Sequence, residues 1–344
     1  MNTVTVTASK TYDIHIGPNL LPTLGLEAKK LGKIKAVCIV SDTNVWPLYG
    51  QIAANSLEDA GFTVSSFVFP AGEESKNGNT YLELLNVLAQ NKLTRSDLIV
   101  ALGGGVVGDL AGFAAATYLR GIRFIQAPTT LLAAVDSSVG GKTAIDLPAG
   151  KNLAGAFCQP SLVLCDIDTL NTLSDDIFRD GCAEVIKYGI LYDPRLFSHL
   201  ESQCLDFDRE SVITRCVQLK RDVVMEDEFD TGARMKLNLG HTIGHAVESR
   251  SAFSLSHGKS VAIGMAIVAR ASGCRDTNRI LAILDQFGLP KQTADSAREL
   301  YTCALSDKKR SGGTVNLIIP AAIGDCRIVP TAVEDLLTFI EEGL

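Results

Sequence analysis

Three of the chain's five histidines stand close together, at positions 241, 245 and 257. His241, His245 and Glu248 are spaced i, i+4 and i+7, which places them on one face of a helix. Imidazole is the commonest metal ligand and the side chain that titrates nearest neutral pH. The cluster, completed by His257, therefore predicts a metal site or an acid/base site. Spacing alone leaves open whether His241 and His245 share an ion or divide metal binding and proton transfer between them.

A glutamate and a lysine stand three residues apart in the apolar segment GCAEVIKYG, residues 181–189. Glu184 and Lys187 then share one face of a helix. A structural ion pair is the simplest alternative, but two charges on an apolar helix are costly to bury without a function. We therefore expect them to face a cleft. A His/His/Glu ligand set with open positions would be a catalytic metal site rather than a structural one.

Further basic residues indicate an anionic ligand. Two glycine-containing turns, 140–142 and 150–152, each carry a lysine. Lys220 and Arg234 precede the histidine cluster, and the late segment Asp307-Lys308-Lys309 adds two more cations. Each of these is unremarkable alone. Together they predict a small substrate that bears phosphate or carboxylate groups.

A glycine-rich turn follows the apolar run 98–102. Gly103, Gly105 and Gly108 satisfy G-x-G-x-x-G between a predicted strand and an alanine-rich helix, the context of a dinucleotide site. Glycines let the backbone approach a pyrophosphate, and the helix N-terminus presents free N–H groups. A turn that merely packs helix on strand is the alternative.

One part of the usual dinucleotide fingerprint is missing. No Asp or Glu occurs between Asp109 and Asp136, where a ribose-binding acid is expected roughly 20 residues after the glycines. Asp42 follows the predicted strand 36–40 and would stand at the carboxyl end of a parallel strand, where ligands of such sheets bind. We therefore expect a dinucleotide-type site whose acid comes from an earlier turn.

The elements that must position these residues change in kind along the chain. Up to about residue 166, β-rich runs alternate with helical segments, which is typical of βαβ units and a mostly parallel sheet. Strands are expected at 4–16, 36–40, 63–69, 98–102 and 124–127, with helices such as 51–60 and 80–91. Later helices are expected at 178–191, 210–227, 260–272, 277–287 and 294–305, interrupted by a hairpin at 315–319 and 326–329. We expect two domains, 1–173 and 174–344, with Ser174 as a helix N-cap at the boundary.

Composition fits this division. The 344 residues suit two domains, and 46% hydrophobic residues suit well-packed cores. A net charge of -7 argues against general nucleic-acid binding. The N-terminus lacks the pattern of a secretory signal, apolar runs are far shorter than a membrane span, and the nine cysteines are scattered singly. We therefore expect a cytoplasmic protein with reduced cysteines and neither nucleic-acid nor membrane partners.

The motifs as a set resemble those of the sugar phosphate cyclase family, and within it the 3-dehydroquinate synthases. The resemblance runs over nearly the whole chain, from 12–17 to 322–324. Its most specific blocks are GGGVVGD (103–109), YLRG (118–121), PTTLLA (128–133), VDSSVGGKT (135–143), GKN (150–152), AEVIKYG (183–189), LNLGHTIGHAVE (237–248), HG (257–258) and DKK (307–309).

The resemblance implies a dehydroquinate synthase-like fold: an α/β N-terminal Rossmann-like domain and an all-α C-terminal domain, with the active site between them. It implies one divalent metal per subunit, zinc or cobalt, held by Glu184, His241 and His257. His245 would then be a substrate or proton-relay residue. The implied substrate and catalytic residues are Arg120, Lys142, Asn152, Lys187, Lys220, Arg234, Asn238, His245 and one of Lys308 or Lys309.

The resemblance also implies a tightly held NAD that is used catalytically and regenerated. Its implied binding residues are Asp42, Asn44, Ala71, Gly72, Glu73, Glu74, Ser75, Lys76, Gly105, Val106, Val107, Gly108, Asp109, Thr129, Thr130, Lys142, Lys151, Thr169, Leu170, Asn171 and Thr172. The implied assembly is a homodimer. Five positions depart from the family pattern: Ala134, Ala144, Asp146, Cys158 and Lys259.

The implied activity is that of a carbon–oxygen lyase of the shikimate pathway. It converts 3-deoxy-D-arabino-heptulosonate 7-phosphate to 3-dehydroquinate and phosphate by transient oxidation, phosphate elimination, reduction, ring opening and an intramolecular aldol. Three alternatives compete: a sister cyclase acting on glucose 6-phosphate or sedoheptulose 7-phosphate, a metal-dependent polyol dehydrogenase, and an inactive NAD-binding regulator. Sister cyclases tend to differ at the positions of Arg234, Asn238 and His245, all of which are present here.

Overall fold

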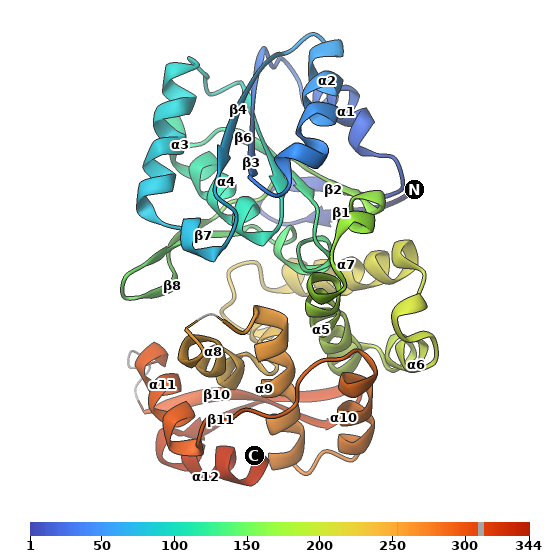
Figure 1. Ribbon diagram of the computed structural model, residues 1–344, viewed down its shortest axis with the longest axis vertical. Helices are drawn as coiled ribbons and strands as arrows, with labels where there is room; N and C mark the ends of the chain where they lie inside the picture. Colours follow the sequence, from blue (N-terminus) through green and yellow to red (C-terminus); the bar gives the residue numbers. More distant parts are fainter. Residues whose placement is uncertain (253, 309–312) are drawn as a thin grey trace. The chain divides into compact units, whose positions relative to one another are not determined.

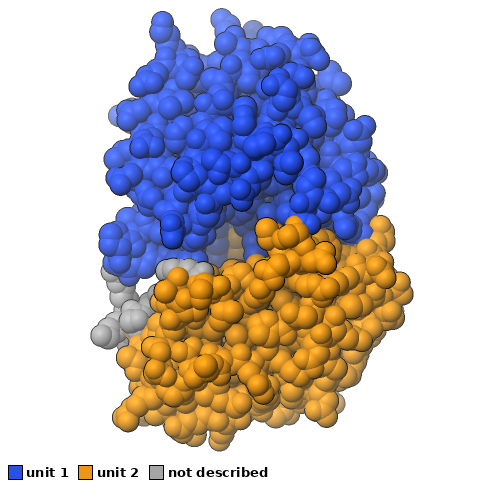
Figure 2. All heavy atoms as spheres, viewed as in Figure 1, with its two compact units in different colours: residues 1–173, 209–229 blue, residues 174–208, 230–344 orange. Residues whose placement is uncertain are grey.

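The computed structural model describes residues 1–252, 254–308 and 313–344. The chain divides into two units, which Figure 2 distinguishes by colour. Unit 1 comprises residues 1–173 and 209–229, and unit 2 comprises residues 174–208 and 230–344. The division predicted from sequence assigned 209–229 to the second domain. Helix α7 (Arg209–Glu226) instead packs on strands β1 and β2 of unit 1, where it buries Val212, Ile213 and Cys216.

Unit 1 is built on a seven-stranded sheet with the order β1-β2-β9-β6-β5-β3-β4. Strand β1 runs antiparallel to β2, and every other neighbouring pair is parallel. The strands are β1 (Asn2–Thr7), β2 (Thr11–Gly17), β3 (Ala36–Asp42), β4 (Thr63–Phe69), β5 (Leu98–Gly103), β6 (Arg123–Pro128) and β9 (Leu162–Asp166). This arrangement confirms the mostly parallel sheet.

Helices cover both faces of this sheet (Figure 1). Helices α1 (Leu24–Lys30) and α2 (Gln51–Asp59) pack on the face that carries Val37 and Ile39. Helices α3 (Gly78–Gln90) and α4 (Gly105–Thr117) pack on the face that carries Cys38 and Val40. Successive residues of a strand point to opposite faces, so a sheet buried on both sides needs the continuous apolar run that β3 has.

Two features of unit 1 differ from the predicted strands. The expected strand 4–16 is a hairpin whose turn lies at residues 8–10. The buried residues on either side of the turn stay in phase, so the alternation runs through it and conceals it. A second hairpin, β7 (Lys142–Leu147) and β8 (Gly150–Phe157), was not predicted because its glycines and half-exposed residues give a weak strand signal. Strand β9 was also missed.

Unit 2 is a helical assembly with one β-hairpin. Its helices are α5 (Asp175–Tyr192), α6 (Pro194–Gln203), α8 (His241–Arg250), α9 (His257–Ala271), α10 (Thr277–Gln286), α11 (Ala297–Lys308) and α12 (Val333–Gly343). Helix α9 is central, because α5, α8, α10 and α12 all pack against it. Ser174 caps α5 as predicted, accepting the N–H of Ile177. Strands β10 (Thr314–Ala322) and β11 (Asp325–Ala332) form the hairpin that the residue pattern predicted.

Short helical turns connect these elements. They are η1 (Leu21–Thr23), η2 (Trp46–Gly50), η3 (Glu73–Ser75), η4 (Tyr118–Arg120), η5 (Ala133–Ser137), η6 (Ile167–Thr172), η7 (Cys204–Asp206) and η8 (Ala233–Asn238). Several carry predicted site residues at the ends of strands. Within the described part of the chain, no helix combines the length and the apolar character that a membrane crossing requires.

Candidate active site

Three helices of unit 2 bring together the predicted metal residues. Glu184 lies in the middle of α5 and is completely buried, while His241 and His257 are the first residues of α8 and α9. The Nε2 atom of each histidine lies 3.6 Å from Oε1 of Glu184. The three ligand atoms all lie within 4.8 Å of one another. Two imidazole nitrogens and a carboxylate converging on one point fit a divalent metal such as zinc.

The protonation of the two histidines differs. Burial, followed by the nearby Lys187 cation, lowers the pKa of His241 well below its usual value, so this ring is neutral at pH 7. Burial also lowers the pKa of His257, but the carboxylates of Glu184 and Glu248 outweigh it and raise this pKa to about 10. A metal ion that binds the two rings at neutral pH must therefore displace one proton.

The position of His257 depends on a close contact between α5 and α9. Asp180, one helical turn before Glu184, accepts hydrogen bonds from Ser256 Oγ at 2.5 Å and from the N–H of Lys259 at 2.9 Å. Its carboxylate therefore caps the N-terminus of α9. A Cβ atom on Gly258 would lie only 1.9 Å from the carbonyl oxygen of Asp180. Glycine after His257 is thus required for this approach of the two helices.

Other predicted catalytic residues surround this cluster. Lys187 is almost completely buried, and its Nζ contacts Oε2 of Glu184. The exposed ring of His245 lies 5.3 Å from His241 and 5.8 Å from His257 between ring centroids. Arg234 is buried in η8, and Asn238 ends that turn, which packs against α5 and leads into α8. Lys308 ends α11, and Lys309 lies outside the described residues.

Unit 1 brings predicted cofactor residues together around one buried cation. Lys76 Nζ lies 3.1 Å from Glu73 Oε1 and 3.1 Å from Asp109 Oδ2, with Asp146 Oδ1 at 3.9 Å. Glu73 also pairs with Lys151 at 3.2 Å. Burial lowers the pKa of Lys76, but the carboxylates outweigh it and raise that pKa above its usual value. Burial raises the pKa of Asp109 to about 6, against the opposing effect of Lys76.

The carboxyl edge of the parallel sheet carries the glycine turn. Strand β5 ends at Gly103 and α4 begins at Gly105, and Gly104 between them offers no side-chain cap. The N–H groups of the first turn of α4 therefore have no side-chain acceptor from their cap residue. Thr129 follows β6 at the same edge. Its hydroxyl is buried and has no hydrogen-bond partner among the residues described. An orphaned polar atom beside a free helix N-terminus fits a pyrophosphate-containing ligand.

Other predicted cofactor residues follow strands at this same edge. Asp42 ends β3, and its Oδ1 accepts the N–H of Asn44 at 2.8 Å. The stretch 71–76 follows β4, and η6 follows β9. The Tyr49 hydroxyl of η2 donates to the carbonyl of Thr169 in η6 at 3.0 Å and shares a hydrogen bond with the Thr172 hydroxyl. These residues therefore lie along one edge of the sheet, although Leu170 has a buried side chain and offers only backbone groups.

The predicted substrate residues of unit 1 do not all lie together. Lys220 of α7 donates through Nζ to the carboxylate of Asp136 at 2.5 Å and to its carbonyl at 2.7 Å. Lys142 begins β7, and Asn152 at the start of β8 has φ 55°. Arg120 ends η4, which connects α4 to the beginning of β6. Arg120 therefore lies at the amino edge of the sheet, opposite the glycine turn.

The structure accounts for some departures from the family pattern. Asp146 accepts the N–H of Asn152 at 2.8 Å, which closes the β7–β8 hairpin. Lys259 of α9 pairs with Asp176 of α5 at 2.6 Å and so adds to the contact between these helices. The N–H of Cys158 donates to the carbonyl of Gly141, a bond that does not depend on the side chain. Nothing in the structure explains alanine at 134 or 144.

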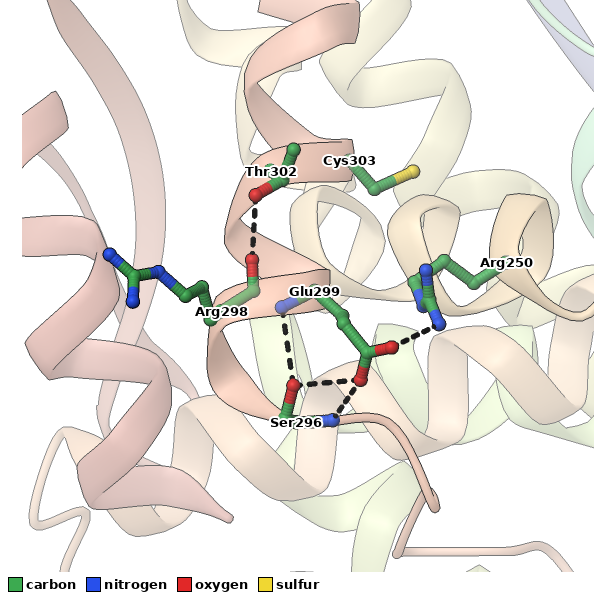
Figure 3. A pocket seen from close by; sticks show the side chains of 6 residues that line it. All are labelled: Arg250, Ser296, Arg298, Glu299, Thr302 and Cys303. Atoms are coloured by element: carbon green, nitrogen blue, oxygen red, sulfur yellow. Dashed lines mark hydrogen bonds and ion pairs between the residues drawn. The ribbon is translucent and has the colours of Figure 1, made fainter.

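A surface pocket of unit 2 lies beside Arg250, the last residue of α8 (Figure 3). It is lined by Arg250, Ser296, Arg298, Glu299, Thr302 and Cys303. Arg250 pairs with Asp295 at 2.6 Å and with Glu299 at 2.7 Å. The charge of Arg250 is therefore balanced by carboxylates of the same unit.

The chain matches known proteins over nearly its full length. Residues 66–180 match the family described as 3-dehydroquinate synthase N-terminal, and residues 181–310 match 3-dehydroquinate synthase C-terminal. A 3-dehydroquinate synthase of Pelobacter propionicus is 47% identical over 354 aligned positions, which cover 98% of each chain.

Solved structures with the same fold include two sugar phosphate cyclases. One is 2-epi-5-epi-valiolone synthase from Streptomyces hygroscopicus subsp. jinggangensis with NAD+ and Zn2+ bound (TM-score 0.87, 27% identity, 98% of this chain and 99% of that one). The other is 2-deoxy-scyllo-inosose synthase complexed with carbaglucose-6-phosphate, NAD+ and Co2+ (TM-score 0.89, 24% identity, 100% of both chains). The comparisons confirm the resemblance drawn from the motifs and the fold class that it implied.

Proposed function

The chain belongs to the 3-dehydroquinate synthase family, and from this membership we propose that it converts 3-deoxy-D-arabino-heptulosonate 7-phosphate to 3-dehydroquinate and phosphate. The reaction is that of a carbon–oxygen lyase and is the second step of the shikimate pathway to the aromatic amino acids. The observation that carries the proposal is the convergence of Glu184, His241 and His257 on one point, within a chain that shares 47% identity with a named synthase.

The proposed cofactors are NAD and one divalent metal, zinc or cobalt. Glu184 Oε1 and the Nε2 atoms of His241 and His257 would hold the metal. When bound, the metal supplies Lewis acidity to substrate hydroxyls and NAD supplies a reversible hydride acceptor. Two sugar phosphate cyclases of the same fold carry NAD+ with Zn2+ or Co2+, which supports the same pairing here.

The residues beside the metal set have distinct proposed roles. Lys187 contacts the second oxygen of Glu184 and so compensates the buried carboxylate while it offers N–H donors to a substrate oxygen. His245 is exposed beside both histidine ligands. An exposed imidazole can accept or deliver a proton through a ring nitrogen, and we assign that task to His245.

The anionic ends of the substrate require cationic and amide donors. We assign this role to Arg234, Asn238 and Lys187 of unit 2 and to Lys142, Asn152 and Lys220 of unit 1. The guanidinium group suits a carboxylate or phosphate because its N–H donors match two oxygens at once. The net charge of -7 does not oppose this, because local clusters of cations override the global sign.

The remaining predicted substrate ligands lack such support. Arg120 follows α4 at the amino edge of the sheet, and its part in phosphate binding stays a prediction. A role for Lys308 or Lys309 also stays a prediction. The chain is further expected to form a homodimer, which sedimentation equilibrium of the purified protein will test.

The cofactor assignment rests on the carboxyl edge of the sheet. The N-terminus of α4, preceded by glycines, suits a pyrophosphate. Asp42 uses Oδ1 to close its own turn, and Oδ2 has no partner among the described residues, which leaves it available to ribose hydroxyls. The ion pairs of Lys76 with Glu73 and Asp109 join η3 to α4 and keep these loops in place without a ligand.

One assay separates this proposal from its rivals. Purified protein with NAD and zinc or cobalt is offered the heptulosonate phosphate, glucose 6-phosphate and sedoheptulose 7-phosphate in parallel. We expect phosphate release from the first substrate only, with no accumulation of NADH. Release from another sugar phosphate would indicate a sister cyclase, and stoichiometric NADH would indicate a dehydrogenase. No phosphate release from any of them would exclude the proposed function.

A further inference from the structure

One buried carboxylate next to the metal set has no role in the reaction proposed above. Glu248 lies on α8 and is only 4% exposed. Its Oε2 lies 3.5 Å from Nδ1 of His257, the ring nitrogen on the far side from Glu184. A carboxylate is expensive to bury unless it has a partner that needs it. Glu248 is therefore expected to act through His257.

The spacing of α8 brings Glu248 to this position. It stands two helical turns after His241 and one turn after His245, on the same face of the helix. His257 begins the next helix, α9, so the ring and the carboxylate meet where α8 and α9 pack. The sequence pattern placed Glu248 on the face with the histidines but did not indicate that its partner is His257.

The packing of α8 on α9 is close enough to fix this contact. A Cβ atom on Gly244 would lie 2.8 Å from the carbonyl oxygen of Ser260, and one on Gly264 would lie 2.0 Å from the carbonyl oxygen of Gly240. Only glycine permits backbones to approach this closely. This close approach of the two backbones brings Glu248 of α8 next to the His257 ring at the start of α9.

The Nδ1 atom of His241 also faces a hydrogen-bond acceptor, but here the acceptor is a backbone carbonyl and not a carboxylate. Its Nδ1 lies 3.0 Å from the carbonyl oxygen of Leu239, and its Nε2 faces Glu184. A carbonyl oxygen can only accept, so Nδ1 is the protonated nitrogen and Nε2 keeps its lone pair. Both histidines thus have an acceptor at Nδ1 and the shared carboxylate at Nε2.

We propose that Glu248 is a positioning residue that accepts the Nδ1–H of His257 and thereby directs the Nε2 lone pair at the metal. This inference rests on the proposed function only in taking His257 as a metal ligand. A carboxylate behind a metal-binding histidine holds the ring orientation and raises the basicity of the ligand nitrogen, and its removal typically weakens metal affinity about 10–100-fold.

The structure also suggests a competing role. His245, Glu248 and His257 form a second group of donor atoms within 4.8 Å of one another, so Glu248 could instead bind a second ion. That role would require His257 to lose both ring protons and bridge two ions. It predicts two ions per chain, whereas a positioning role predicts one.

The test is a cobalt titration of the full-length protein after chelation, without substrate. Competition with a chromogenic chelator gives the affinity, and the visible absorption of Co2+ reports the ligand geometry. We expect one ion per chain in the wild type. Glu248→Ala should bind Co2+ about 10–100-fold more weakly. Glu248→Gln should lose less Co2+ affinity than Glu248→Ala, because the glutamine amide oxygen can still accept the Nδ1–H of His257.

A matched control is Glu299→Gln on α11, a carboxylate-to-amide change at an exposed ion pair of the same unit. It should leave the cobalt affinity unchanged. Circular dichroism and thermal unfolding of each variant verify that unit 2, which contains both positions, remains folded. Wild-type affinity and spectrum in folded Glu248→Ala, or two ions per wild-type chain, would overturn the proposal.

A second measurement uses only the wild-type protein and therefore tests the proposal even if Glu248→Ala does not fold. Long-range 15N–1H spectra of the zinc-loaded wild type, with histidine selectively labelled, report which nitrogen of His257 carries the proton. We expect the proton on Nδ1; a proton on Nε2 would refute the proposed role. Because neither experiment uses the sugar phosphate, a failure of the proposed reaction in the phosphate assay remains distinguishable from a failure of this inference.

Discussion

The two buried charge clusters of this protein are built in opposite ways. In unit 1 a buried cation, Lys76, is surrounded by the carboxylates of Glu73, Asp109 and Asp146, and Lys151 adds a second cation at Glu73. In unit 2 a completely buried anion, Glu184, is faced by two imidazole nitrogens and the ammonium group of Lys187. Similar residue types are therefore centred on a positive charge in one unit and on a negative charge in the other.

This difference decides what each cluster can do. Around Lys76 the carboxylates pair with ammonium groups of the protein itself, and these ion pairs join loops of unit 1. Around Glu184 the two Nε2 atoms and Oε1 all lie within 4.8 Å of one another, and these are ligand atoms of the kinds that bind zinc. The first cluster is a framework for the cofactor turns, and the second is the proposed reaction centre.

The largest expected effect comes from removing a proposed ligand. In His257→Ala the metal site keeps only two protein donors, so we expect loss of stoichiometric Co2+ binding and of nearly all phosphate release. Lewis-acid stabilisation worth several kcal/mol would disappear. NAD binding should survive, because its proposed residues belong to unit 1. Full activity of the variant after chelation would contradict the ligand assignment.

The corresponding change in unit 1 should affect stability and spare metal binding. Lys76→Met leaves three carboxylates around a buried apolar side chain, and breaking a buried pair in this way costs roughly 3–5 kcal/mol. Urea unfolding should show this loss, together with weaker NAD binding. The Co2+ affinity of the folded variant should match the wild type. If the cobalt affinity fell as well, the two clusters would not be independent.

A smaller loss is expected from the helix contact that positions His257. Gly258→Ala places a methyl group 1.9 Å from the carbonyl oxygen of Asp180, so α9 must move away from α5. Such overpacking costs about 1–3 kcal/mol, and metal affinity should fall with it. Gly78→Ala, at a position with no atom within 4 Å, is the matched control. Thermal unfolding and cobalt titration of both variants provide the comparison.

The smallest effect concerns the pH dependence of unit 1. Burial raises the pKa of Asp109 to about 6, above its value of about 3.9 in an unfolded chain. Between these values the native state holds a proton that the unfolded state lacks, so this group's contribution to stability is lost as pH rises toward 6.

Asp109→Asn removes this contribution. The free energy of unfolding of the wild type should fall between pH 4 and 6 by on the order of 1 kcal/mol more than that of the variant. Urea unfolding at several pH values tests this difference. If the free energy of unfolding changed equally with pH in the wild type and in Asp109→Asn, Asp109 would not be the group that binds the extra proton in the native state.

Much of the architecture was predictable because it depends on local patterns. Continuous apolar runs such as 98–102 indicated buried parallel strands, and helical periodicity indicated most of unit 2. The β1–β2 hairpin, whose turn lies at residues 8–10, was missed because buried and exposed residues alternate in the same phase in both strands. The β7–β8 hairpin was missed because the glycines and half-exposed residues of β8 give a weak strand signal.

Within the proposed site, the sequence by itself determined the residue types: the histidine cluster, the Glu184–Lys187 pair, the glycine turn and the face on which Glu248 lies. Only the tertiary structure decided their partners. It brought α7, and with it Lys220, to unit 1, turned Glu248 toward His257, placed Asp180 at the start of α9, and put Arg120 at the amino edge of the sheet. The physical reason is that helical spacing defines which side chains share a face, whereas the packing of backbones, often through glycine, defines what that face meets.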